Sequence, residues 1–152
     1  MGNTKNSSMD KSRDIEKVKK TLGRYYSSQE HSNKEEFLSV WHADARRISF
    51  GNDNKMLVST SEDIIKYTID GLRIAKERDP DFYVNFQVNE IKHVAVHDVV
   101  ASAEVDWKME MPMARGFHSS FFHLAKIEDE WIIIGLTDRG VEEPKSPQTD
   151  EA

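Results

Sequence analysis

The sequence predicts an α+β fold in which a curved antiparallel sheet wraps round three N-terminal helices. Two observations carry this prediction. Apolar side chains recur at helical spacing between residues 15 and 75, whereas the chain after Asp81 alternates between apolar and polar residues as strands do. Helices followed by long antiparallel strands are typical of the α+β class. The 152 residues suit one domain, which we expect to span 14–141 between disordered tails at 1–13 and 142–152.

Each of the three helices has its own sequence signal. The first carries an apolar stripe at helical spacing, formed by Ile15, Val18, Leu22, Tyr25 and Tyr26. The second begins after Asn33, which can cap it, and Glu36 three residues later is typical of a capping box. The third is capped by Thr60 or Ser61 and ends at Asp79-Pro80, because proline does not continue a helix.

The strands follow from alternation. A short hairpin is predicted between residues 48 and 58, with its turn at Gly51-Asn52-Asp53-Asn54. The next long strand has one apolar face, made of Val99, Ala101, Ala103, Val105, Trp107 and Met109. In the strand from Arg115 to Ile127 both faces are partly apolar: His118, Ser120, Phe122 and Leu124 share one, and Phe117, Ser119, Phe121 and His123 the other.

Strands that are apolar on both faces need cover on both sides. Three helices can cover one face of the sheet, so the convex face requires another partner. We therefore expect a homodimer through this face, centred on Phe117, Phe121 and Ile133 or its neighbours, because an exposed apolar patch of this kind usually marks an interface.

The composition excludes several classes of function. A net charge of −6 and only short basic clusters argue against a nucleic-acid partner. No apolar run reaches the ~20 residues of a membrane helix, and the N-terminus lacks the apolar core of a secretory signal, so we expect a cytoplasmic protein without membrane partners. No cysteine is present, and no His/Asp/Glu set has metal-ligand spacing, so we expect neither a metal nor a cofactor.

Two segments resemble a known superfamily. The first, GRYYSSQEHSNKEEFLSVWHADARRISF, spans residues 23–50; the second, SSFFHLAKIEDEWIII, spans 119–134. Together they resemble the nuclear transport factor 2-like superfamily, in particular its polyketide-cyclase-like and putative lumazine-binding groups and the ketosteroid isomerases. The resemblance implies a cone-shaped domain with the helices inside the sheet. It implies little about function, since this fold hosts isomerases, dehydratases, hydrolases, transport factors and assembly domains.

The resemblance also implies which isomerase residues are present. The oxyanion-hole tyrosine falls on Tyr25, which is retained, whereas the general base falls on Ser49 and the second acid on Ser120. Serine cannot move a proton between carbons as a carboxylate does. We therefore expect no isomerase activity on 3-oxo-Δ5 steroids.

The residues on the predicted concave face favour a small-molecule pocket with mostly apolar walls and a few polar groups. The candidate ligand-binding residues are Tyr25, Trp41, Ser49, Trp107, Met109, His118, Ser120, Phe122 and Asp138. Histidine titrates near neutrality, so His118 can act as an acid or base, and Asp138 can do so if it is buried at the pocket mouth. Structural alternatives stay open for these side chains: the tryptophans can be core residues, Tyr25 a half-buried helix tyrosine and His118 a histidine bonded inside the sheet. Asp138 can be a strand-end residue in water.

We therefore expect the protein either to bind or to bind and transform a flat and partly apolar organic ligand; the catalytic residues stay unassigned. The alternative is a non-catalytic dimerisation or interaction domain whose interior is filled by side chains. The volume of the interior separates the two, because an open cavity of a few hundred Å³ favours a ligand and a filled one favours interaction.

Overall fold

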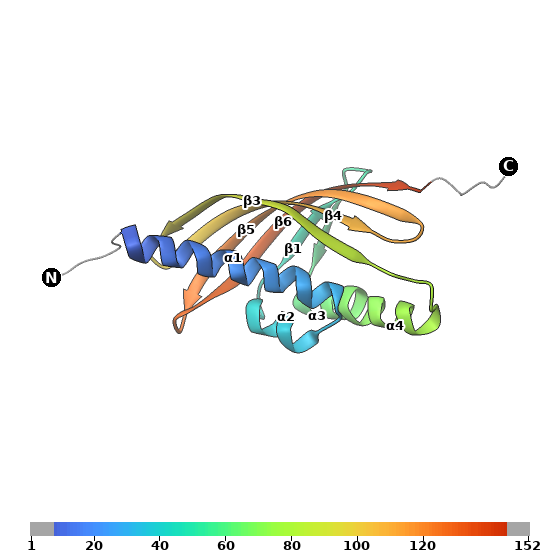
Figure 1. The fold of residues 1–152 in the computed structure, drawn as a ribbon, viewed down its shortest axis with the longest axis horizontal. Helices are drawn as coiled ribbons and strands as arrows, with labels where there is room; N and C mark the ends of the chain where they lie inside the picture. The colour runs from blue at the N-terminus through green and yellow to red at the C-terminus, as the bar shows by residue number, and fades with distance from the viewer. Residues whose placement is uncertain (1–7, 146–152) are drawn as a thin grey trace.

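The computed structural model describes residues 8–145, in which the helices lie on one face of a curved, unclosed sheet (Figure 1). The helical elements are α1 (Ser8–Glu30), α2 (Lys34–Val40), α3 (Ser61–Asp63), η1 (Ile64–Asp70) and α4 (Gly71–Arg78). The strands are β1 (Arg47–Phe50), β2 (Met56–Ser59), β3 (Asn85–His97), β4 (Val100–Glu110), β5 (Ala114–Ile127) and β6 (Glu130–Pro144). None of the described helices is long and apolar enough to cross a membrane.

The folded part reaches beyond 14–141 at both ends. Residues 8–13, which we expected in a disordered tail, belong to α1, and residues 142–144 belong to β6. Of the rest of the two expected tails, Lys145 directly follows β6, and residues 1–7 and 146–152 lie outside the described residues.

The described strands form one six-stranded sheet in the order β2-β1-β6-β5-β4-β3. Every neighbouring pair is antiparallel as predicted except β1 and β6, which are parallel. The expectation of a wholly antiparallel sheet is therefore wrong for this pair. Parallel neighbours need a long connection, and here that connection includes α3, η1, α4 and the four strands β2 to β5, so β6 returns beside β1 in the same direction. The parallel pair places β1 next to the centre of the sheet.

The predicted caps are present. The Asn33 side chain accepts a hydrogen bond from the backbone N–H of Glu36 at 3.0 Å and so starts α2. Thr60 starts α3, because its hydroxyl accepts from the N–H of Asp63, whose carboxylate accepts from the Thr60 N–H in return. The single third helix that the sequence predicts has π-helical geometry over Ile64–Asp70, between short α-helical segments.

The alternation predicted for β4 and β5 is observed. Ala103, Val105 and Phe122 are buried on the concave face, against the helices. Phe117 and Phe121 lie on the convex face, where each is 45% exposed. The core therefore sits between the helices and the concave face, and the described chain leaves the other face of the sheet uncovered.

A β-bulge in β6 places Ile134, and not Ile133, on the convex face where we expected Ile133 or a neighbour. His123 pairs with Gly135 and Leu124 pairs with Ile133, which leaves Ile134 as the extra residue. Because a bulge reverses which side chains face the core, Ile133 is fully buried and Ile134 is 39% exposed on the convex side. After the bulge, Leu136 and Asp138 point into the concave face.

Candidate functional site

A cavity of about 850 Å³ lies between the concave face of the sheet and the helices. Its walls come from α1, β1, β2, η1 and the long strands, so residues far apart in the sequence meet there. The predicted site residues that line it are Tyr25, Ser49, Trp107, Met109, His118, Ser120 and Asp138. The volume lies within the range of roughly 300–1,000 Å³ that small-molecule sites occupy.

The other two candidates, Trp41 and Phe122, are core residues and do not line the cavity. The Trp41 indole N–H donates to Ser61 Oγ at 2.9 Å, and its ring stacks on Tyr25 and Phe37. Phe122 is 1% exposed and meets the edge of Tyr25. Both side chains hold α1 and α2 against the sheet, which is the core role left open for Trp41.

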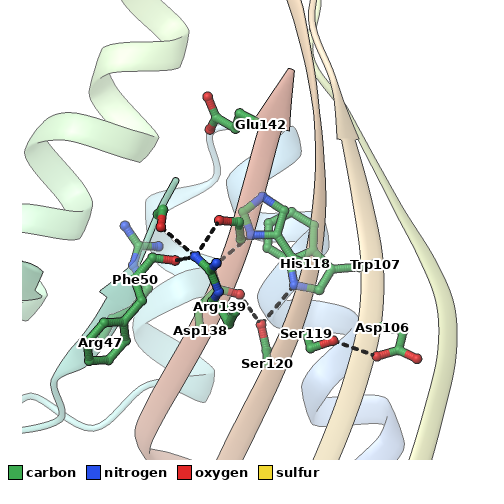
Figure 2. Close-up of polar contacts among 12 residues, drawn as sticks. Arg47, Phe50, Asp106, Trp107, His118, Ser119, Ser120, Asp138, Arg139 and Glu142 are labelled. Atoms are coloured by element: carbon green, nitrogen blue, oxygen red, sulfur yellow. Dashed lines mark hydrogen bonds and ion pairs between the residues drawn. The ribbon is translucent and has the colours of Figure 1, made fainter. Parts of the chain in front are cut away.

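Asp138 accepts two hydrogen bonds at the wall of the cavity (Figure 2). His118 Nδ1 lies 2.8 Å from Oδ2, and Ser120 Oγ donates to Oδ1 at 2.6 Å. The Trp107 indole N–H in turn donates to Ser120 Oγ at 2.8 Å. Each oxygen of a carboxylate that is only 8% exposed therefore has a partner, as buried charges require.

The sheet register builds this group. His118 and Ser120 are two residues apart on β5 and so share a face, and Ser120 pairs with Asp138 on β6. Each residue was a candidate by itself, but their contact was not predicted. The Glu128-Asp129 turn alone does not predict this contact, because it places Ile127 opposite Glu130 and would by itself set Ser120 opposite Thr137. The bulge at Ile134 shifts the pairing by one residue and brings Asp138 opposite Ser120.

Two glycines make room for the imidazole of His118. Gly140 is its cross-strand partner, and a Cβ there would overlap the ring; a Cβ at Gly116 would lie 2.8 Å from Nε2. On its opposite side the ring stacks on Trp107, with centroids 4.1 Å apart and planes at 15°. Glycine weakens a strand interior, so glycine at both positions indicates space reserved for this side chain. The sequence analysis missed both glycines, although glycine inside a predicted strand is itself a signal.

His118 has the arrangement of an acid–base group. When its Nδ1–H donates to Asp138, the lone pair lies on Nε2. Nε2 is buried and has no hydrogen-bond partner in the part of the chain that the structure describes. The Glu142 side chain lies nearby, since a Cβ at Gly116 would be 3.4 Å from its Cγ. A ligand would reach Nε2 only after the covering side chains move.

Two tyrosines of α1 reach the cavity, and only Tyr25 was predicted. The Tyr25 hydroxyl accepts from the Arg47 guanidinium at 3.4 Å. The Tyr26 hydroxyl is buried without a hydrogen-bond partner among residues 8–145. Burial raises the pKa of Tyr26 well above its ordinary value, and the neighbouring Ser120 hydroxyl offsets part of this effect. Tyr26 therefore stays protonated and can donate to a ligand.

Arg47 also lines the cavity and was missed by the sequence analysis. The signal was its position two residues before Ser49, which places both side chains on one face of β1. Ser49 and Ser120 both line the cavity at the positions where the resemblance implies catalytic acids. The absence of steroid isomerase activity stays a prediction.

Comparison with known proteins supports one family. A family described as putative lumazine-binding matches residues 13–136. None of the curated proteins compared with the chain matches it.

Several solved structures share the fold. Hexachlorocyclohexane dehydrochlorinase LinA-type3 from Novosphingobium barchaimii LL02 superposes with a TM-score of 0.73 at 9% identity, covering 96% of this chain and 99% of that one. A nuclear transport factor 2-like protein from Salmonella enterica gives 0.66 at 13%, covering 91% and 99%. A putative dehydratase of the same superfamily from Streptomyces avermitilis gives 0.60 at 16%, covering 84% and 96%. At these identities the similarity establishes the fold alone.

Proposed function

The chain belongs to the putative lumazine-binding family of the nuclear transport factor 2-like superfamily, and we propose that it binds a flat, partly apolar organic molecule in its cavity. The observation that carries this proposal is the open volume of about 850 Å³. An interaction domain with a filled interior would leave no such space. The solved relatives include a dehydrochlorinase and a putative dehydratase, which is consistent with small-molecule chemistry in this fold.

The lining of the cavity supports a ligand of mixed character. Trp107, Phe86 and Met109 offer apolar contact, while His118 and Ser120 place polar atoms at one end. Apolar walls with a few convergent polar groups are typical of ligand sites. A flat ring system would pack against the Trp107 side of the cavity and direct a carbonyl or hydroxyl group towards the polar end.

Proton transfer is a second candidate function, and the His118–Asp138 pair favours it. Once the side chains that cover it move aside, Nε2 of His118 would take a proton from a carbon beside a carbonyl group, and the electron pair of the C–H bond would move onto the carbonyl oxygen. Asp138, 2.8 Å from Nδ1, would stabilise the imidazolium, which would then return the proton to carbon. Isomerisation by such a route needs no further reactant.

A thermal-shift screen against a metabolite library tests the binding proposal. A ligand at 100 times its dissociation constant should stabilise the fold by ~2.7 kcal/mol, which is a shift of several degrees for a domain of this size. The shift should shrink in Tyr25→Phe, His118→Ala and Ser120→Ala variants. A shift that all three variants retain would place the ligand elsewhere, and no shift with flat heterocycles, aromatic polyketides and terpenoids would favour the interaction domain.

We also propose a homodimer through the convex face of the sheet. The apolar side chains exposed there on neighbouring strands include Phe117, Phe121, Ile134 and Val141. Single exposed apolar residues are ordinary, but a cluster on adjacent strands favours a protein partner. A second copy of the chain would cover this face with an identical one, as in most symmetric dimers.

A further inference from the structure

Arg47 places a cation in the cavity wall, and its hydrogen-bond partners are all neutral. Nη1 donates to Gln29 Oε1 at 3.1 Å and to the Tyr25 hydroxyl at 3.4 Å, and Nη2 donates to Thr68 Oγ1 at 3.2 Å. Within residues 8–145, no carboxylate forms an ion pair with this guanidinium. Arg24 and Arg73, by contrast, do form ion pairs with carboxylates.

The setting of Arg47 is built rather than incidental. Two of its acceptors come from buried residues of α1, since Tyr25 is 2% and Gln29 5% exposed. Neutral acceptors hold the guanidinium in one position, but they do not neutralise its charge. A guanidinium carries five N–H donors in a fork that matches a carboxylate. Three of the five have partners here, so donors remain for an anion that enters the cavity.

The third acceptor lies in an unusual segment. Thr68 belongs to the π-helix Ile64–Asp70, and Tyr67 and Thr68 both line the cavity. π-Helical geometry is rare in proteins and occurs frequently at functional sites, because it is less favourable than the α-helix. Its presence beside Arg47 is a second observation, independent of the charge, that this wall of the cavity has a functional role.

The parallel pairing of β1 and β6 sets the distance between Arg47 and the acid–base group. Arg47 pairs with Leu136 and Ser49 with Asp138. Two residues of strand span roughly 6.6 Å and neighbouring strands lie about 4.8 Å apart, so the Cα atoms of Arg47 and Asp138 are roughly 8 Å apart. A bicyclic aromatic acid is about long enough to contact both ends of this wall.

We propose that Arg47 binds a carboxylate, so that the cavity takes planar organic acids with the carboxylate at Arg47 and the ring system extending towards His118. This inference rests on the proposed ligand-binding function and names its substrate class. The Asp138 carboxylate at the far end repels a second negative charge. One cation and one anion on the same wall therefore fix the direction in which a monoanion enters.

Naphthalene-2-carboxylate and naphthalene-2-carboxamide are matched probes for this inference, because they share size and planarity and differ in charge. Their dissociation constants should be measured by calorimetry on the wild type and on Arg47→Gln. We expect the wild type to bind the carboxylate roughly ten- to a hundredfold more tightly than the carboxamide, as charge-assisted hydrogen bonds would produce. In Arg47→Gln, the ratio of the two dissociation constants should fall to about one.

Arg73→Gln is the control, since it makes the same change at an exposed arginine of α4 outside the cavity lining; it should keep the wild-type ratio. Equal binding of both probes by the wild type overturns the inference but leaves the pocket intact. Binding of neither probe contradicts the proposed function itself. If Arg47→Gln does not fold, the same two dissociation constants are compared in the wild type and in Arg47→Lys, which keeps the positive charge and should still prefer the carboxylate. A ratio near one in the wild type overturns the inference.

Discussion

Gly140 lies directly opposite His118 in the pairing of β5 with β6, and a Cβ at Gly140 would overlap the imidazole ring. The absence of a side chain there lets the ring lean across β6 to Asp138, two residues earlier on the same face. Position 140 thus controls whether the His118–Asp138 contact can form.

Gly140→Ala should therefore destabilise the fold by about 1–3 kcal/mol, the usual cost of overpacking a filled site, and should break the 2.8 Å contact between His118 and Asp138. Gly135→Ala is the control on the same strand, because a Cβ there meets nothing within 4 Å. Chemical denaturation of both variants measures the difference. Equal stability of the two variants would show that the imidazole moves aside without cost.

Ser120→Ala should cost about 1–3 kcal/mol of unfolding free energy, because it leaves the Trp107 indole N–H without its acceptor and removes a donor from Asp138. Ser119→Ala is the neighbouring control. Ser119 donates to Asp106 on the other face of the sheet. Water can replace this hydrogen bond there, so Ser119→Ala should lower the free energy of unfolding by less than about 1 kcal/mol. Urea denaturation compares the two, and a larger loss in Ser119→Ala would contradict the account of the buried network.

Burial of Tyr26 should lower the free energy of unfolding in alkaline solution. Its pKa is raised in the folded state by burial, whereas in the unfolded chain it titrates near about 10. Above that pH the unfolded state releases a proton that the folded state keeps, so the free energy of unfolding falls as the pH rises. Stability measured between about pH 9 and 11.5 should fall less steeply in Tyr26→Phe than in the wild type. Tyr67→Phe, at a residue that is 68% exposed, should keep the wild-type slope.

If the exposed apolar side chains of the convex face form an interface, the protein is a homodimer with twice the chain mass of 17.5 kDa. Analytical ultracentrifugation at micromolar concentration should give a dimer for the wild type and a monomer for Phe117→Ser combined with Phe121→Ser. Met113→Ser removes an exposed apolar residue from the β4–β5 turn and should leave the dimer unchanged. A monomeric wild type would refute the interface.

The sequence predicted those parts of the fold that depend on local pattern. Alternation identified the buried face of β4, and short-range capping chemistry identified the starts of α2 and α3 at Asn33 and Thr60. The π-helix and the bulge at Ile134 were missed, because each adds one residue to a regular pattern without a residue type that requires it. The parallel β1–β6 pair was missed because pairing between distant strands depends on the tertiary fold.

The candidate site was predicted residue by residue but not as an arrangement. His118, Ser120 and Asp138 carry functional groups that the sequence displays, whereas their contact depends on the register of two strands. Arg47 escaped notice because an arginine on a short strand is usually solvated, and only the structure shows its three neutral partners. Trp41 was assigned to the pocket because size and aromaticity do not distinguish a cavity wall from a core.

The central claim is that a ligand enters the cavity between the helices and the concave face. The most direct measurement is a crystal structure of the protein with the tightest ligand from the thermal-shift screen. The account predicts a planar ring inside the cavity against the Trp107 side, with a polar atom of the ligand within hydrogen-bond distance of Arg47, His118 or Ser120. A ligand seated on the convex face, or anywhere outside the cavity, would contradict it.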